Sequence, residues 1–170
     1  MKNGKVHLYW GDGKGKTTAA MGLTLRALGA GKRVTVVQFL KGTPSGEISL
    51  LCRLGASVHR CHPGLKFVFQ MTEEEKRDCL AEHTAMLRKA LAEDADLLIL
   101  DEACAACQLG MVEEAMLRRA VEDRPPQQEV VLTGRDPADW MRQDADYETE
   151  MCCRKHPYQS GLDAREGIEF

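Results

Sequence analysis

The chain has 170 residues and a formal net charge of −3, with 44% hydrophobic and 29% charged residues. This length fits one domain, 1–170, and the balance is typical of a soluble globular protein. Without a basic excess, nucleic acid is not expected as a partner, because nonspecific affinity comes mainly from Lys and Arg on phosphates. No apolar run reaches the roughly 20 residues of a membrane-spanning helix, and no signal-peptide core is apparent. We therefore expect a cytoplasmic protein without a membrane partner.

Short apolar runs alternate with segments of helical period. Strands are predicted over 5–10, 33–40, 96–102 and 129–135, with weaker candidates at 56–61 and 147–153. Helices are predicted from 16 to about 30, from a capping box at 72–75 onward, around 112–120, and briefly after 135. The second of these helices is predicted to bury a stripe of Leu80, Thr84, Leu87 and Leu91. This alternation predicts an α/β fold with a mostly parallel sheet flanked by helices.

The first predicted strand leads into a glycine-rich turn, WGDGKGKTT at 10–18. Free backbone N–H groups, the positive end of a helix dipole and a lysine at Lys16 favour phosphate oxygens there, and the Thr17 hydroxyl can reach Mg²⁺. The spacing departs from G-x-x-x-x-G-K-[ST], because Trp10 stands where the first glycine should fall and Gly11 comes one residue late. The pattern predicts a shortened triphosphate cradle with an aromatic residue at its mouth.

Two acidic residues, Asp101 and Glu102, end the predicted strand LLILDE. A carboxylate at the end of a neighbouring parallel strand can hold Mg²⁺ or its waters beside a bound triphosphate. The alternative is a solvated acidic pair.

The seven cysteines are irregularly spaced. Cys104 and Cys107 form a C-x-x-C pair, and HRCH at 59–62 is the other dense cluster. A structural zinc site needs about four ligands, and no second C-x-x-C exists. We interpret the cysteines as reduced thiols, several of them buried.

Five segments together resemble one enzyme family. They are GDGKGKTTAAMG, GKRVTVVQFLKG, LLILDE, VVLTGR and RKHPYQSGLDAREGIEF, and the resemblance runs from about Lys5 to Phe170. Their order and spacing resemble the P-loop class of ATP:corrinoid adenosyltransferases, which act on cob(I)alamin or cob(I)yrinic acid a,c-diamide. The resemblance implies a recombinase-like P-loop fold, a homodimer, and transfer of the adenosyl group of ATP to cobalt in adenosylcobalamin biosynthesis or salvage.

The resemblance also implies roles for individual residues. ATP would bind with its triphosphate reversed relative to ordinary P-loop enzymes, so that Co(I) attacks the ribose C5′ and triphosphate departs. Lys16 and Glu102 would be catalytic, and Thr17 with Glu102 would hold Mg²⁺. The phosphates would be bound by Gly11, Asp12, Gly13, Lys14, Gly15, Lys16, Thr17 and Thr18. Arg26 matches a family arginine to which we assign no role.

For the corrinoid, the resemblance implies that aromatic rings pack against the face of the ring that loses its lower ligand when Co(II) is reduced to Co(I). A flavoprotein is a candidate reductant for this step. Phe67 and Phe69 lie in the matching stretch, and core packing is the alternative for two alternating phenylalanines.

The sequence departs from the family pattern in two places. Trp10 replaces a small polar residue, and no N-terminal arm precedes the first strand. Lys155 and His156 of the C-terminal segment are then candidates to shield the cobalt, unless that segment is simply solvated.

Two other functions fit the same motifs. A P-loop ATPase or small kinase would use Glu102 to orient water or an acceptor, and would produce ADP. A nucleotide-dependent corrinoid carrier would bind both ligands and turn over slowly. A DNA-binding, recombinase-like function is disfavoured by the net charge.

Overall fold

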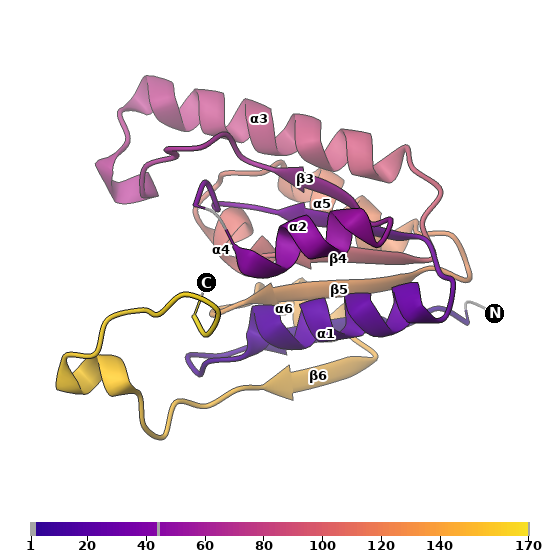
Figure 1. The fold of residues 1–170 in the computed structure, drawn as a ribbon. Helices are drawn as coiled ribbons and strands as arrows, with labels where there is room; N and C mark the ends of the chain where they lie inside the picture. Colours follow the sequence, from indigo (N-terminus) through magenta and orange to yellow (C-terminus); the bar gives the residue numbers. More distant parts are fainter. Residues whose placement is uncertain (1–2, 44, 170) are drawn as a thin grey trace.

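Strands and helices alternate along the chain in the computed structural model, which describes residues 3–43 and 45–169 (Figure 1). Phe170, which ends the GIEF segment, lies outside the described residues, as do residues 1–2 and 44. The elements are β1 (Val6–Trp10), α1 (Lys16–Gly29), β2 (Val34–Gln38), α2 (Gly46–Arg53), β3 (Ser57–Arg60), η1 (Val68–Gln70), α3 (Glu73–Leu91), β4 (Leu97–Asp101), α4 (Ala103–Gln108), α5 (Glu114–Glu122), β5 (Glu129–Gly134), α6 (Asp139–Asp144), β6 (Tyr147–Glu150) and η2 (Pro157–Ser160).

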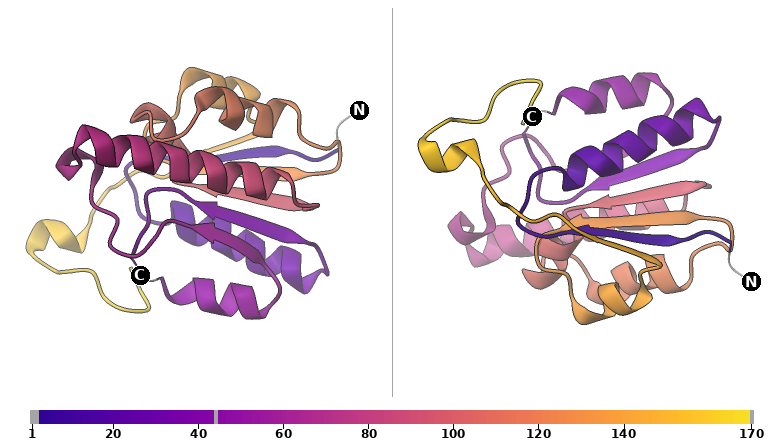
Figure 2. Two further views of the ribbon diagram at one scale, coloured as in Figure 1. Left: turned by 90° about the horizontal axis from the view of Figure 1, so that it is seen from above. Right: turned by 90° about the horizontal axis from the view of Figure 1, so that it is seen from below.

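The strands form one six-stranded sheet in the order β3-β2-β4-β5-β1-β6, and every pairing in it is parallel. Helices α1 and α2 cover one face, and α3 to α6 cover the other (Figure 2). This arrangement confirms the predicted α/β fold with a parallel sheet flanked by helices. Because β1 and β4 lie on either side of β5, the turn after β1 and the acidic end of β4 meet at the same edge of the sheet.

The side chains of β4 alternate between the two faces of the sheet. Leu98 and Leu100 join the core under α3 to α6, whereas Leu97 and Ile99 join the core under α1 and α2. All five residues of β4 are buried, which is why the strand reads as a continuous apolar run. By the same alternation, Asp101 belongs to the face that α1 covers.

Several predicted boundaries hold, and others shift. The capping box that begins α3 is present, with Thr72 and Glu75 each bonded to the other's backbone N–H. The predicted stripe of α3 is only partly right: Leu91 is 39% exposed, and His83 is buried on the inward face instead. The helices α2 and α4 were not predicted.

Among the described residues, no helix is both long and apolar enough to cross a bilayer.

Candidate functional site

A cavity of about 630 Å³ opens at the carboxyl ends of β1 and β4. Ligands of open parallel sheets bind at this edge, where the strand order reverses direction. Its walls come from the glycine-rich turn, the first turn of α1, the segments after β2, β4 and β5, and the C-terminal segment. The lining residues are Asp12, Gly13, Lys14, Gly15, Lys16, Thr17, Thr18, Lys41, Ser45, Glu47, Glu102, Arg135, Cys153, His156, Tyr158, Gln159, Ile168 and Glu169.

The glycines of the turn allow it to pack against the chain that follows β6. A Cβ atom on Gly13 would lie 2.6 Å from the Met151 carbonyl oxygen, and so would one on Gly11, whose φ of 110° also favours glycine. The Gly13 N–H donates to that same oxygen at 2.6 Å, and the Gly11 N–H donates to the Arg135 carbonyl at 3.1 Å. Gly11 is therefore a buried residue of the turn. Unlike the other predicted phosphate ligands, it does not line the cavity.

The start of α1 supplies the groups that suit an anion. The backbone N–H groups of Gly15, Lys16 and Thr17 find no acceptor among the described residues, as expected for the first turn of a helix. Lys16 Nζ lies 2.7 Å from the Gly13 carbonyl oxygen, and burial lowers the pKa of this lysine. Lys14 Nζ reaches the Ile168 carbonyl at 3.1 Å. Both ammonium groups bond only neutral carbonyls here, so they remain available for phosphate oxygens.

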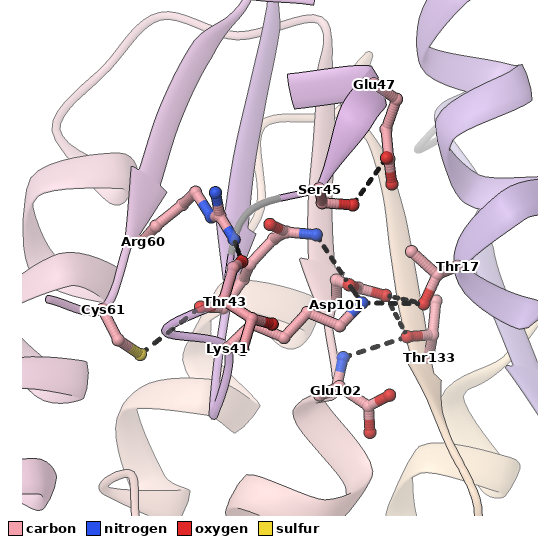
Figure 3. Close-up of polar contacts among 11 residues, drawn as sticks. Thr17, Lys41, Thr43, Ser45, Glu47, Arg60, Cys61, Asp101, Glu102 and Thr133 are labelled. Atoms are coloured by element: carbon pink, nitrogen blue, oxygen red, sulfur yellow. Dashed lines mark hydrogen bonds and ion pairs between the residues drawn. The ribbon is translucent and has the colours of Figure 1, made fainter. Parts of the chain in front are cut away.

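Behind the cavity, the Asp101 carboxylate is fully buried and accepts four hydrogen bonds (Figure 3). The hydroxyls of Thr17 and Thr133 donate to Oδ1 at 2.9 and 2.7 Å. Gln38 Nε2 and Lys41 Nζ donate to Oδ2 at 3.1 and 2.8 Å. These donors come from α1, β5, β2 and the turn after β2. One buried carboxylate is therefore hydrogen-bonded to four segments beside the cavity.

Glu102 directly follows Asp101 but has a different environment. Its backbone is left-handed, with φ 60°, and its N–H donates to the Thr133 hydroxyl at 3.0 Å. This turn directs its side chain into the cavity, away from the Asp101 carboxylate (Figure 3). Burial raises the pKa of the Glu102 carboxyl and the Asp101 charge raises it further, while Lys41, Lys16 and Arg135 act in the opposite direction.

Trp10 does not lie at the mouth of the cavity, contrary to the prediction. It alternates with Tyr9 along β1 and packs against the core on the α6 side, with the Arg142 guanidinium 4.4 Å from the centre of its ring. The C-terminal segment does contribute to the cavity: His156 is a lining residue, and Cys153 donates its N–H to Asp12 Oδ1 at 2.8 Å. Lys155 does not line the cavity.

Phe67 and Phe69 are 71% and 83% exposed, which excludes the core-packing alternative. Their rings are stacked at 5.6 Å between centroids, with Phe69 in η1 and Phe67 directly before it. They do not line the cavity at the glycine-rich turn. The structure therefore does not bring them together with the predicted phosphate ligands.

All seven cysteines are free thiols. Cys104 is buried on α4, and burial raises its pKa to about 12. In residues 3–43 and 45–169, no group of three or more His, Cys, Asp or Glu side chains is arranged to hold a metal ion by itself.

Three residues of the site are not predicted by the sequence motifs, namely Gln38, Lys41 and Thr133. The available signal was a polar residue near the end of each buried strand, since Gln38, Asp101 and Thr133 all interrupt apolar runs. The position of Asp101 at the end of a strand is predicted, whereas its hydrogen bond with Thr17 is seen only in the structure.

The Asp101 cluster should contribute strongly to stability. In Asp101→Ala, the Lys41 ammonium and three uncharged donors lose their acceptor, and we expect a loss of about 3–5 kcal/mol in the free energy of unfolding. Urea unfolding at pH 7 measures this loss. The control Asp163→Asn, in the exposed C-terminal segment, should stay within about 0.5 kcal/mol of wild type. A loss of under about 1 kcal/mol in Asp101→Ala would contradict the role assigned to this carboxylate.

Glu102→Gln should stabilise the protein at neutral pH. Because the pKa of Glu102 is raised in the folded state, wild type loses stability as pH rises from the unfolded value toward the folded one. The amide has no charge to bury, so its advantage in melting temperature should be larger at pH 8 than at pH 4.5. Thermal unfolding across that range measures the difference, with exposed Glu166→Gln as the control. An advantage that does not grow with pH would show that burial of the Glu102 charge is not costly.

Comparison with known proteins is consistent with this geometry. The family model described as ATP:corrinoid adenosyltransferase BtuR/CobO/CobP matches residues 2–170. A corrinoid adenosyltransferase of Pseudomonas aeruginosa is 35% identical over 172 residues, which cover 99% of this chain and 85% of that protein. Those of Escherichia coli K12 and Salmonella typhimurium are each 34% identical over 170 residues, covering 99% of this chain and 87% of theirs. The chain belongs to the ATP:corrinoid adenosyltransferase family.

Proposed function

We propose that this chain transfers the 5′-deoxyadenosyl group of ATP to the Co(I) centre of a corrinoid and releases triphosphate, with the cavity at the glycine-rich turn as its ATP site. The main supporting observation is the first turn of α1, whose N–H groups from Gly15 to Thr17 have no acceptor among the described residues. Lys14, Lys16, Lys41 and Arg135 line the same cavity. This is the environment that a polyanionic leaving group requires.

The reaction needs alignment and charge neutralisation more than proton transfer. Co(I) is already a strong nucleophile, and the ribose C5′ carries no proton that must be removed. The protein's contribution is to hold the carbon in line with cobalt and to stabilise the negative charge that develops on triphosphate. Lys16 is suited to the second task because it lies at the helix end and bonds only a carbonyl in the structure.

We propose that ATP lies with its triphosphate reversed relative to ordinary P-loop enzymes, as the resemblance implies. The shortened turn supports this orientation. The N–H groups of Gly11 and Gly13 already bond the carbonyls of Arg135 and Met151, so the turn offers phosphates fewer donors ahead of the helix than its glycine content suggests. Phosphate contacts are then concentrated at the start of α1.

Mg²⁺ fits this site when triphosphate is bound with it. The cation prefers oxygen ligands and is commonly held by one or two side chains together with substrate phosphates. The Thr17 hydroxyl gives its proton to Asp101 and accepts a hydrogen bond from Lys41 Nζ at 3.2 Å, which leaves one lone pair on its oxygen for a cation. The Glu102 carboxylate faces the same cavity. These two residues would hold the ion, which would neutralise charge on the leaving group.

For the corrinoid, we propose that Phe67 and Phe69 pack against the lower face of the ring once its axial ligand leaves. Their exposure and mutual stacking are consistent with a contact surface for a large planar ligand. A flavoprotein is the proposed electron donor, and either cobalamin or a biosynthetic precursor the acceptor. We further propose a cytoplasmic homodimer, on the basis of the family resemblance.

Lys16→Ala should reduce adenosyl transfer by about 10²–10³-fold, because the charge nearest the leaving group is lost. ATP is mixed with chemically reduced corrinoid, and product is followed by the organocobalt absorbance and by triphosphate release. Lys89→Ala, on the exposed side of α3, is the control and should retain full activity. Formation of ADP and phosphate by the wild type, without triphosphate, would favour the ATPase or kinase alternative and refute the proposal.

Phe67→Ala and Phe69→Ala should slow the reaction that starts from Co(II) corrinoid with a flavoprotein reductant by about tenfold, equivalent to about 1.4 kcal/mol of lost aromatic contact. ATP affinity, measured by calorimetry, should change by less than about twofold, because neither ring lines the ATP cavity. Comparison with chemically pre-reduced Co(I) substrate separates reduction from transfer. An unchanged rate from Co(II) would rule out this role for the two rings.

A further inference from the structure

Leu40, the second residue after β2, has a left-handed backbone, with φ 57°. Within the described residues, Glu102 is the only other non-glycine residue with a positive φ. A left-handed conformation is unfavourable for leucine and persists only where the surrounding structure enforces it. The next residue is Lys41, whose Nζ lies 2.8 Å from Asp101 Oδ2 and 3.2 Å from the Thr17 hydroxyl. The strained residue therefore immediately precedes a residue of the proposed active site.

The group that holds Leu40 is the buried imidazole of His83, from the middle of α3. Its Nδ1 lies 2.8 Å from the Met111 carbonyl oxygen, which can only accept, so Nδ1 carries the proton. Nε2 is then an acceptor, and it receives the Leu40 N–H at 3.2 Å. The ring is oriented further by the Phe39 side chain, whose centroid is 5.5 Å away with the two rings nearly perpendicular. One tautomer thus connects the turn after β2 to the segment before α5.

The titratable groups around His83 preserve this arrangement. Cys61, just after β3, places its Sγ 3.0 Å from Nε2 and donates its S–H to the Gln38 carbonyl oxygen, 3.7 Å away. Cys79, one turn earlier on α3, lies 3.8 Å from Nδ1. Burial raises the pKa of both thiols, that of Cys79 to about 11, so both stay protonated at neutral pH. Burial also lowers the pKa of His83, and the hydrogen bond to the Met111 carbonyl and the Glu82 carboxylate only partly oppose this shift. The ring consequently stays neutral and keeps its acceptor.

We propose that His83 is a positioning residue of the active site: by accepting the Leu40 N–H it fixes the turn after β2 and so places the Lys41 ammonium against Asp101 and Thr17. The inference rests on the proposed function in that it takes the Asp101 cluster as part of the ATP site. It assigns His83 no contact with substrate. Its effect is transmitted through Leu40 and Lys41 alone.

Two variants of His83 separate this role from simple core packing. In His83→Gln, the side-chain oxygen can reach the position of Nε2 and accept the Leu40 N–H, while the contact with Met111 is lost. In His83→Asn, the shorter amide can donate to the Met111 carbonyl at the position of Nδ1, but cannot reach Leu40. We expect His83→Asn to weaken ATP binding about fivefold to tenfold and His83→Gln to remain within about twofold of wild type. Isothermal calorimetry with ATP measures both.

A control and a second background test whether the effect passes through Lys41. Met86→Ala removes a buried apolar side chain of α3 that forms no hydrogen bond with the turn after β2, and should leave ATP affinity within about twofold of wild type despite its loss of stability. In a Lys41→Met background, His83→Asn should have less than about a twofold further effect, because the positioned group is gone.

Equal losses of ATP affinity in the two His83 variants would overturn the proposal. So would a loss from His83→Asn that persists undiminished in Lys41→Met. Circular dichroism confirms that each variant is folded at the temperature of the titration. ATP binding is measured without corrinoid. A wild type that binds ATP but fails to transfer the adenosyl group would therefore refute the proposed function, while the ATP affinities of the His83 variants would still test the role of His83.

Discussion

The buried Asp101 carboxylate is the interaction on which the site depends. A carboxylate can be kept out of water only if its oxygens are fully hydrogen-bonded, and Asp101 meets that requirement with donors from Thr17, Gln38, Lys41 and Thr133. Each donor belongs to a different segment at the carboxyl edge of the sheet. The cost of burying one charge therefore sets the relative positions of α1, β2, β4 and β5, and the cavity forms in front of them.

The neighbouring strand ends carry the two strained residues of the described chain, Leu40 after β2 and Glu102 after β4. Each precedes or supplies a charged side chain that faces the cavity. In both cases a buried acceptor stabilises the turn through its backbone N–H: His83 Nε2 bonds Leu40, and the Thr133 hydroxyl bonds Glu102. The left-handed backbone at these two positions therefore directs the side chains of Lys41 and Glu102 toward the site.

The C-terminal segment completes the other side of the cavity. The strand β6 lies at the edge of the sheet beside β1 (Figure 1), and the chain that leaves it is hydrogen-bonded to the glycine-rich turn. The Met151 carbonyl bonds the Gly13 N–H and leaves no room for a side chain at Gly11 or Gly13. Two of the glycines that resemble phosphate ligands in the sequence are therefore also required by contact between the turn and the C-terminal segment.

The sequence alone determined the order of the strands and of the helices α1, α3, α5 and α6, the parallel sheet, the capping box of α3 and the glycine-rich turn before α1. Each of these depends on local periodicity or on residues a few positions apart. The sequence could not determine which acid Thr17 would bond, the inward packing of Trp10, or the contact between His83 and Leu40, 43 residues apart in the chain. Those outcomes depend on the strand order, which places β1 and β4 on either side of β5, and on the buried faces that α1 and α3 present to the sheet. Tertiary structure decided them because hydrogen bonds to buried groups form only between segments that packing has already brought together.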